Sequence, residues 1–179
     1  NLGQYVLTQA IDRTTPGLEN LSTVDPQFFN PVQPPLWSFE LGGNFGVTFD
    51  FSKDNEYLIV GAPTQQGIDN LAQPLLNAGA VYSFKINEDT DKWELVQTIY
   101  APGGQVANGT FGGVIKTYKN FALIGSSIIG IDAKVNGPSY VYLYKLNPNG
   151  QWVYVQTLAS DQSVGLPVNS PAYGGNVLF

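Results

Sequence analysis

Paired carboxylates are a catalytic arrangement that this composition leaves open. The chain of 179 residues contains no histidine and no cysteine, which excludes a Ser-His-Asp triad and a Cys-His pair. Two pairs of carboxylates could still act as a general acid and a general base: Asp89 with Asp91, and Asp132 with Asp161. Asp89 and Asp91 stand in a predicted hairpin turn, where acids are ordinary. The sequence therefore predicts no enzymatic activity, no catalytic residues and no cofactor.

The composition is that of an all-β protein. Charged residues make up 12% of the chain, against roughly 25% in an average soluble protein, and aromatic residues make up 13%. The net charge of −6 is scattered, so no basic stripe predicts nucleic-acid binding. No apolar run is long enough to predict membrane insertion.

One hairpin pattern organises the chain. Residues 45–63 predict two strands, because Val47, Phe49 and Phe51 alternate with polar residues and an apolar run occupies residues 57–60. The turn between them is polar. The same plan recurs at residues 111–127, and a third copy begins with YGGNVLF at residues 173–179.

Two further strands follow each hairpin. In the first copy they are predicted at residues 79–86 and 93–99, and in the second copy at residues 139–146 and 152–158. Trp152 follows Trp93 by 59 positions (152 − 93). We call residues 45–99 unit 1 and residues 111–158 unit 2. Four strands in a unit of this size match one blade of a β-propeller.

The ends of the chain carry parts of the same pattern. GQYVLTQAI at residues 3–11 matches GQWVYVQTL at residues 150–158, with Gln9 in the place of Gln156. The predicted organisation is therefore a last strand of a preceding blade, a proline-rich connection, two complete blades with their linkers, and a first strand of a following blade. These parts are residues 1–11, 12–44, 45–110, 111–172 and 173–179.

Two units are too few to close a ring, since propellers have four to eight blades. The sequence therefore predicts a segment of a longer propeller. The missing blades would lie on further residues of the polypeptide or on another chain.

The repeated motifs resemble those of FG-GAP repeat propellers, the family of integrin α-subunit heads and bacterial relatives. Both units carry Phe-Gly, an apolar strand that ends in Gly, and a last strand that opens with Trp; unit 2 has Ser126–Ser127 where the motif has Ala-Pro. We expect the glycines to let strands approach near the axis, and the aromatic residues to pack between blades. The motif residues are Phe45, Gly46, Gly61, Ala62, Pro63, Trp93, Phe111, Gly112, Gly125 and Trp152.

The resemblance also bears on calcium, which some FG-GAP blades bind through a D-x-D-x-D-G-x-x-D turn. Asp50, Asp54 and Glu56 are near these positions but out of register. We therefore expect no metal site. The corresponding residues are Phe49, Phe51, Lys53 and Tyr57 in unit 1, and Gly113, Ile115, Thr117 and Phe121 in unit 2.

The resemblance implies ligand binding through loops on one face of the propeller. The candidate surfaces are loops 64–78 and 128–138 and linkers 100–110 and 159–172. Leu71, Leu75 and Leu76 in the first loop are expected to cap the fold, with contact to a partner as the alternative. Glycosylation sequons stand at Asn20 and Asn108.

Three functions follow as hypotheses. The first is a non-enzymatic scaffold for adhesion that binds a protein or a glycan. The second is a structural component of a large extracellular or virion assembly. The third is an accessory module of a glycan-active enzyme. All three place the chain outside the cell, or on a cell or virion surface.

Overall fold

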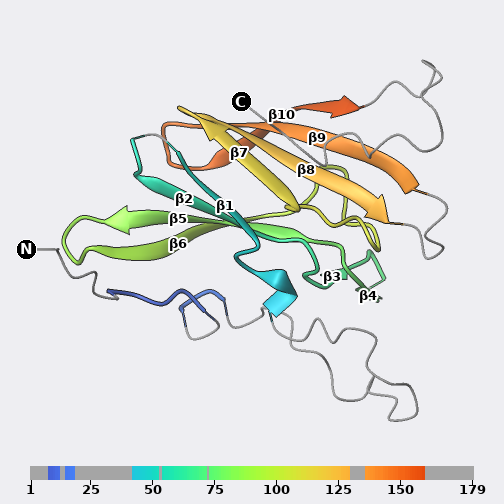
Figure 1. Ribbon diagram of the computed structural model, residues 1–179, viewed down its shortest axis with the longest axis horizontal. Coiled ribbons are helices and arrows are strands. Elements are labelled where there is room, and N and C mark those ends of the chain that lie inside the picture. Colours follow the sequence, from blue (N-terminus) through green and yellow to red (C-terminus); the bar gives the residue numbers. More distant parts are fainter. Residues whose placement is uncertain are drawn as a thin grey trace, which may run out of the picture.

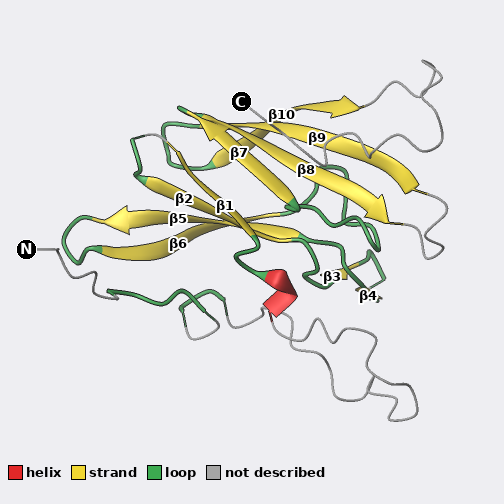
Figure 2. Cartoon of the chain, viewed as in Figure 1, coloured by secondary structure: helices red, strands yellow, loops and turns green. Residues whose placement is uncertain are grey.

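The computed structural model describes residues 8–12, 15–18, 42–52, 54–71, 73–129 and 136–159. They form two four-stranded antiparallel sheets and a two-stranded ribbon (Figures 1 and 2). The predicted all-β class with four-stranded antiparallel sheets is confirmed.

Unit 1 forms one sheet with the strand order β1-β2-β5-β6. A short 3₁₀ turn, η2 (Gly42–Asn44), precedes it, and the ribbon of β3 (Gly67–Ile68) and β4 (Pro74–Leu75) lies in the loop after β2. The polar turn after β1 uses positive φ at Asp54 and Asn55, which suits these residue types. The four strands are β1 (Thr48–Ser52), β2 (Tyr57–Ala62), β5 (Ala80–Asn87) and β6 (Lys92–Ile99).

Unit 2 forms the other sheet, and its strands follow the same order from first to fourth. They are β7 (Val114–Tyr118), β8 (Phe121–Ile129), β9 (Asn136–Leu146) and β10 (Trp152–Ala159). The predicted loop at residues 128–138 is wrong at both ends, because Ile129 pairs with Asn136. The register shifts between Ser127 and Ile129, and β8 continues to Ile129 beyond this irregularity.

The entry into the two sheets has the same backbone conformation. Asn44 and Thr110 have φ of 55° and 45°, and Gly46 and Gly112 have φ of 88° and 89°. The N–H of Gly46 donates to the carbonyl oxygen of Gly61 at 2.9 Å, and the N–H of Gly112 donates to that of Gly125 at 3.0 Å. The Phe-Gly motif thus starts each unit with the same left-handed turn, which glycine adopts at little cost.

The phenylalanine of each motif packs on its own sheet in the same way. Ring centroids of Phe45 and Tyr82 are 5.5 Å apart, and those of Phe111 and Tyr142 are 5.7 Å apart. Both units also carry a bulge at the same place in the fourth strand, with Val96 and Val155 as the extra residues. The sequence repeat is therefore a repeat of detailed geometry.

The two sheets pack on each other through unlike faces. Unit 1 offers the face formed by Tyr57, Ile59, Val81 and Ile99, which we call the front face. Unit 2 meets it with the opposite face, here called the back face. The equivalent back-face residues of unit 1 belong to a second core cluster instead. The back-face residues of unit 2 in this core are Ala122, Ile124, Tyr142, Tyr144 and Trp152.

The back face of unit 1 is covered by the N-terminal segment. Leu18 is buried in its core cluster, and Ile11 packs against that cluster. In Figure 1 this segment runs along the unit 1 sheet, on the side away from unit 2. Ile11 is the sequence equivalent of Ile99, which lies in the interface between the two units. Residues 8–12 therefore lie against unit 1 as the end of β6 lies against unit 2.

The apolar residues that alternate along β1 and just before it are exposed. Val47 and Phe49 expose 61% and 59% of their surface, whereas the polar side of β1 faces β7. The hydroxyl of Thr48 donates to the carbonyl oxygen of Gly112 at 2.7 Å, and the N–H of Thr117 donates to a carboxylate oxygen of Asp50 at 2.9 Å. Polar groups thus join the two first strands because they satisfy backbone groups at their edges.

Candidate functional site

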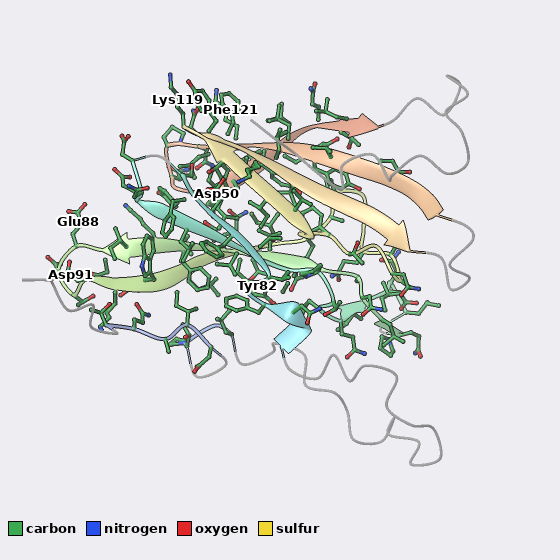
Figure 3. The ribbon with its side chains drawn as sticks, viewed as in Figure 1. Asp50, Tyr82, Glu88, Asp91, Lys119 and Phe121 are labelled. Atoms are coloured by element: carbon green, nitrogen blue, oxygen red, sulfur yellow. The ribbon has the colours of Figure 1, made fainter. Side chains whose placement is uncertain are left out.

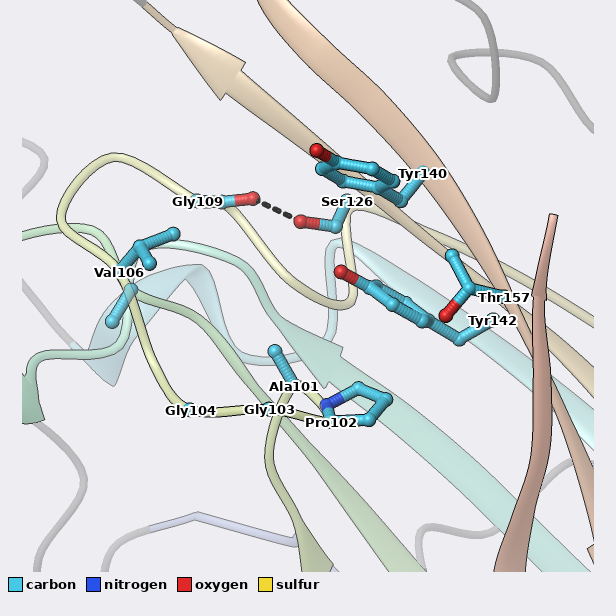
Figure 4. Close-up of a pocket in the computed structure, with 11 residues that line it drawn as sticks. Ala101, Pro102, Gly103, Gly104, Val106, Gly109, Ser126, Tyr140, Tyr142 and Thr157 are labelled. Atoms are coloured by element: carbon cyan, nitrogen blue, oxygen red, sulfur yellow. Dashed lines mark hydrogen bonds between the residues drawn. The ribbon is translucent and has the colours of Figure 1, made fainter. Parts of the chain in front are cut away.

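A pocket of about 340 Å³ opens between the linker that joins the units and the unit 2 sheet (Figure 4). The linker, which the sequence named as a candidate surface, contributes Ala101, Pro102, Gly103 and Gly104. Strands β9 and β10 contribute three residues of the opposite wall: Tyr140, Tyr142 and Thr157. Gly103 and Gly104 add no side chain to this wall, and nothing lies within 4 Å of a β-carbon placed on either of them.

Two stacked tyrosines form the wall of this pocket. The ring centroids of Tyr140 and Tyr142 are 6.0 Å apart, and their planes meet at 29°. Figure 4 shows both hydroxyls at the same end, toward Ser126 and Gly109. The Ser126 hydroxyl donates to the carbonyl oxygen of Gly109 at 2.6 Å, which holds the linker against the sheet.

The described residues of the lining present hydroxyls, apolar groups and backbone, and none of them has a charged side chain. Burial raises the pKa of Tyr142, and Tyr140 and Tyr154 add to this, while the hydrogen bond with Ser126 acts in the opposite direction. The tyrosine is therefore neutral at physiological pH and acts as a hydrogen-bonding group. The arrangement suits an uncharged ligand that stacks on a ring and bonds to hydroxyls.

The buried tyrosines predict a loss of stability in base. Burial raises the pKa of Tyr82, with Tyr100 second, and burial raises the pKa of Tyr144, with Tyr142 and Tyr154 following. In the unfolded chain these groups ionise near pH 10, whereas the folded protein keeps them neutral. Their stabilising contribution is complete below about pH 10 and is lost as the pH rises toward the folded-state values.

We therefore expect the free energy of unfolding to fall steadily above about pH 10. Urea unfolding at pH 8, 10 and 11, followed by circular dichroism, measures this. Tyr82→Phe and Tyr144→Phe remove the ionising groups, so both variants should lose less stability between these pH values. A free energy of unfolding that is constant from pH 8 to 11 would contradict the expectation.

A second candidate feature is a pair of side-chain bridges between neighbouring parts of the fold. The amide nitrogen of Gln97 donates to the carbonyl oxygen of Trp152 at 3.1 Å, and the N–H of Trp152 donates to the amide oxygen of Gln97 at 2.7 Å. Gln9 makes the same two bonds with Trp93, at 3.0 and 2.8 Å. Each glutamine thus satisfies both backbone groups of the tryptophan near the start of the fourth strand in the unit that follows.

Sequence reasoning noted these glutamines as repeat markers but missed their role. The available signal was their recurrence at the equivalent positions 9, 97 and 156. Gln97 is half-buried, whereas Gln156 is exposed.

The bridge between Gln97 and Trp152 predicts that a glutamine-to-alanine substitution affects stability more at residue 97 than at residue 156. Gln97→Ala removes two hydrogen bonds to part-buried backbone groups and should lower the free energy of unfolding by about 1–3 kcal/mol. Gln156→Ala, its control on an exposed surface, should change it by less than about 0.5 kcal/mol. Urea unfolding of both variants is the measurement, and equal losses would show that the bridge contributes nothing.

The motif residues lie in two groups. Gly61 and Gly112 meet at a close approach between the backbones of the two units, and Ala62 beside Gly61 is fully buried. Trp152 is buried between the sheets, while Trp93 is half-buried at the edge of the N-terminal segment. None of the motif residues lines the pocket.

The acidic residues named in the sequence analysis have structural positions, as far as they lie in the described part of the chain. Asp91 has φ of 53° at the tip of the β5–β6 hairpin, where Figure 3 places it near Glu88, and it does not line the pocket. Asp50 faces β7, as described above. Asp132 and Asp161 lie outside the described residues. Among the described residues no three His, Cys, Asp or Glu side chains gather to hold a metal.

The predicted leucine cap of the 64–78 loop is wrong. Leu71 and Leu76 are 79% and 65% exposed, and Leu75 is half-buried in the β3–β4 ribbon. Contact with a partner remains the alternative. Asn108 lies in the linker, and its side-chain oxygen accepts a hydrogen bond from Asn77 at 3.1 Å; Asn20 lies outside the described residues.

No protein-family model matches this chain, and no curated protein sequence matches it. In the part of the chain that the structure describes, no helix has the length and apolar character needed to cross a bilayer.

Proposed function

We propose that this chain is a non-enzymatic segment of an FG-GAP-type propeller, and that it binds a glycan or a protein through the pocket at the linker. It acts outside the cell, or on a cell or virion surface, as a scaffold within a larger ring. The observation that carries the proposal is the packing of unlike faces between two units of the same geometry.

Face-to-back packing supports a ring because it can be continued. Two sheets that met through equivalent faces would complete each other and stop at a pair. Unlike faces leave one face of each kind for a further neighbour, and such a series closes into a ring when the rotation allows. Radial repetition of four-stranded sheets is the arrangement of a propeller.

The pocket supports binding of a neutral ligand. It combines the ring of Tyr140 with the hydroxyl groups of four lining residues: Ser126, Tyr140, Tyr142 and Thr157. Aromatic rings beside hydroxyls suit sugar rings as well as uncharged peptide segments. The linker glycines let a ligand approach the backbone.

Titration of the isotope-labelled full chain with neutral gluco-, manno- and galacto-oligosaccharides tests the glycan form of the proposal by NMR. We expect shifts at Tyr140, Thr157 and residues 101–106, and a loss of these shifts in Tyr140→Ala. Tyr118→Ala, an exposed tyrosine on β7, is the matched control. Shifts that survive Tyr140→Ala would refute the pocket, and their absence with every sugar would refute glycan binding.

A structural role in a large assembly is the second candidate, and the exposed apolar residues on the outer side of unit 2 favour it. Phe121 and Leu158 each expose 37% of their surface there. Sedimentation of the full chain at increasing concentration tests this role, since a packing component would associate through that face.

A further inference from the structure

Three glutamines occupy equivalent positions, and the structure pairs two of them. Gln9 bridges the backbone of Trp93, and Gln97 bridges the backbone of Trp152. Gln156 follows Gln97 by 59 positions (156 − 97) and also comes directly after the bulge of its strand. It is exposed, and no described residue forms a hydrogen bond with its side chain.

The surface around Gln156 repeats the surface around Gln97. Leu158 and Phe121 stand in the places of Ile99 and Tyr57, and Figure 3 shows Phe121 beside Lys119 at the tip of the β7–β8 hairpin. In unit 1 these positions are buried against the back face of unit 2. The front face of unit 2 is therefore apolar in the same pattern, formed by Phe121, Leu123, Val141 and Leu158.

We infer that the front face of unit 2 binds the back face of a third four-stranded unit of the same design. In this complex the side-chain amide of Gln156 bridges the N–H and C=O of the residue in that unit's fourth strand that is equivalent to Trp93 and Trp152. Leu158 and Phe121 become buried, as Ile99 and Tyr57 are. The inference rests on the ring arrangement proposed above and is independent of what the pocket binds.

The proposed binding partner of the front face of unit 2 follows from the interface that units 1 and 2 already form. A third unit meets the front face with the shape and backbone groups that unit 2 offers to unit 1. A second copy of this chain is less suited, because Ile11 and Leu18 of the N-terminal segment cover the back face of its unit 1. The back face of unit 1 in the second copy would be accessible only after the N-terminal segment had detached from it.

A lengthened chain tests the inference. YGGNVLF at residues 173–179 matches residues 111–117 in motif order, so repeating residues 118–159 after Phe179 completes a third unit. We expect the side-chain amide protons of Gln156 to exchange about tenfold more slowly in the lengthened chain than in the original. Gln156→Ala should raise the unfolding equilibrium constant of the added unit about tenfold.

Gln151→Ala, the same change at an exposed turn residue, is the control and should leave the added unit unaffected. An added unit that stays unfolded, or that folds while Gln156 exchanges as before, overturns the inference. Protection of Gln156 by dimerisation of the original chain would assign the face to a second copy and would also overturn it. A failed sugar titration tests the pocket alone and does not bear on Gln156.

Discussion

Trp152→Ala is expected to lower the free energy of unfolding by about 3–5 kcal/mol. The indole is 3% exposed between the two sheets, and its N–H donates to the hydroxyl of Ser83 at 3.1 Å. The substitution removes a large buried ring and leaves a cavity in the core that joins the units. A domain is typically stable by about 5–15 kcal/mol, so this loss is a large part of the total.

Two variants separate the causes of this loss. Trp152→Phe keeps most of the ring and removes the bond to Ser83, so it should cost less than alanine. Trp93→Ala makes the same change at the half-buried equivalent residue and should also cost less. Urea unfolding followed by circular dichroism measures all three, and an equal loss at Trp93 and Trp152 would contradict the difference in packing.

Gly61→Ala is expected to lower the free energy of unfolding by about 1–3 kcal/mol or more. A β-carbon at residue 61 would lie 2.2 Å from the carbonyl oxygen of Gly112 and 2.4 Å from the hydroxyl oxygen of Thr48. The first of these atoms belongs to the backbone of the other unit. Relief of the clash therefore requires the two sheets to move apart.

Gly46→Ala is the control for Gly61→Ala. Gly46 has φ of 88° and no atom within 4 Å of an added β-carbon, so alanine there costs only left-handed backbone strain, about 1–2 kcal/mol. Thermal unfolding of both variants, with crosslinking between β1 and β7, reports stability and separation of the sheets. Sheets that keep their spacing in a fully stable Gly61→Ala protein would show that close approach is not required.

Much of the fold follows from local patterns in the sequence. The four-strand repeat could be predicted because Phe-Gly, the apolar strands and the tryptophans recur in one order. These features depend on short segments, such as the left-handed turn at Gly46 and the polar turn at Asn55. The left-handed turn of the Phe-Gly motif recurs in unit 2 at Gly112.

The remaining features depend on neighbours that periodicity does not reveal. The alternation of β1 predicts a strand but does not say which side is covered, and its polar side faces β7. The length of β8 and β9 depends on pairing across the hairpin. The pocket arises from the path of the linker past Tyr140, and the bridge by Gln97 arises from the placement of one unit on the other.

The rotation between neighbouring units is the measurement that tests the central claim most directly. An experimental structure of the chain within its natural assembly gives the rotation that carries unit 1 onto unit 2. A ring of four to eight blades requires about 45–90° around one axis, with further units related by the same rotation. Two sheets that stand alone, with no third unit against Gln156 and Leu158, would contradict the account.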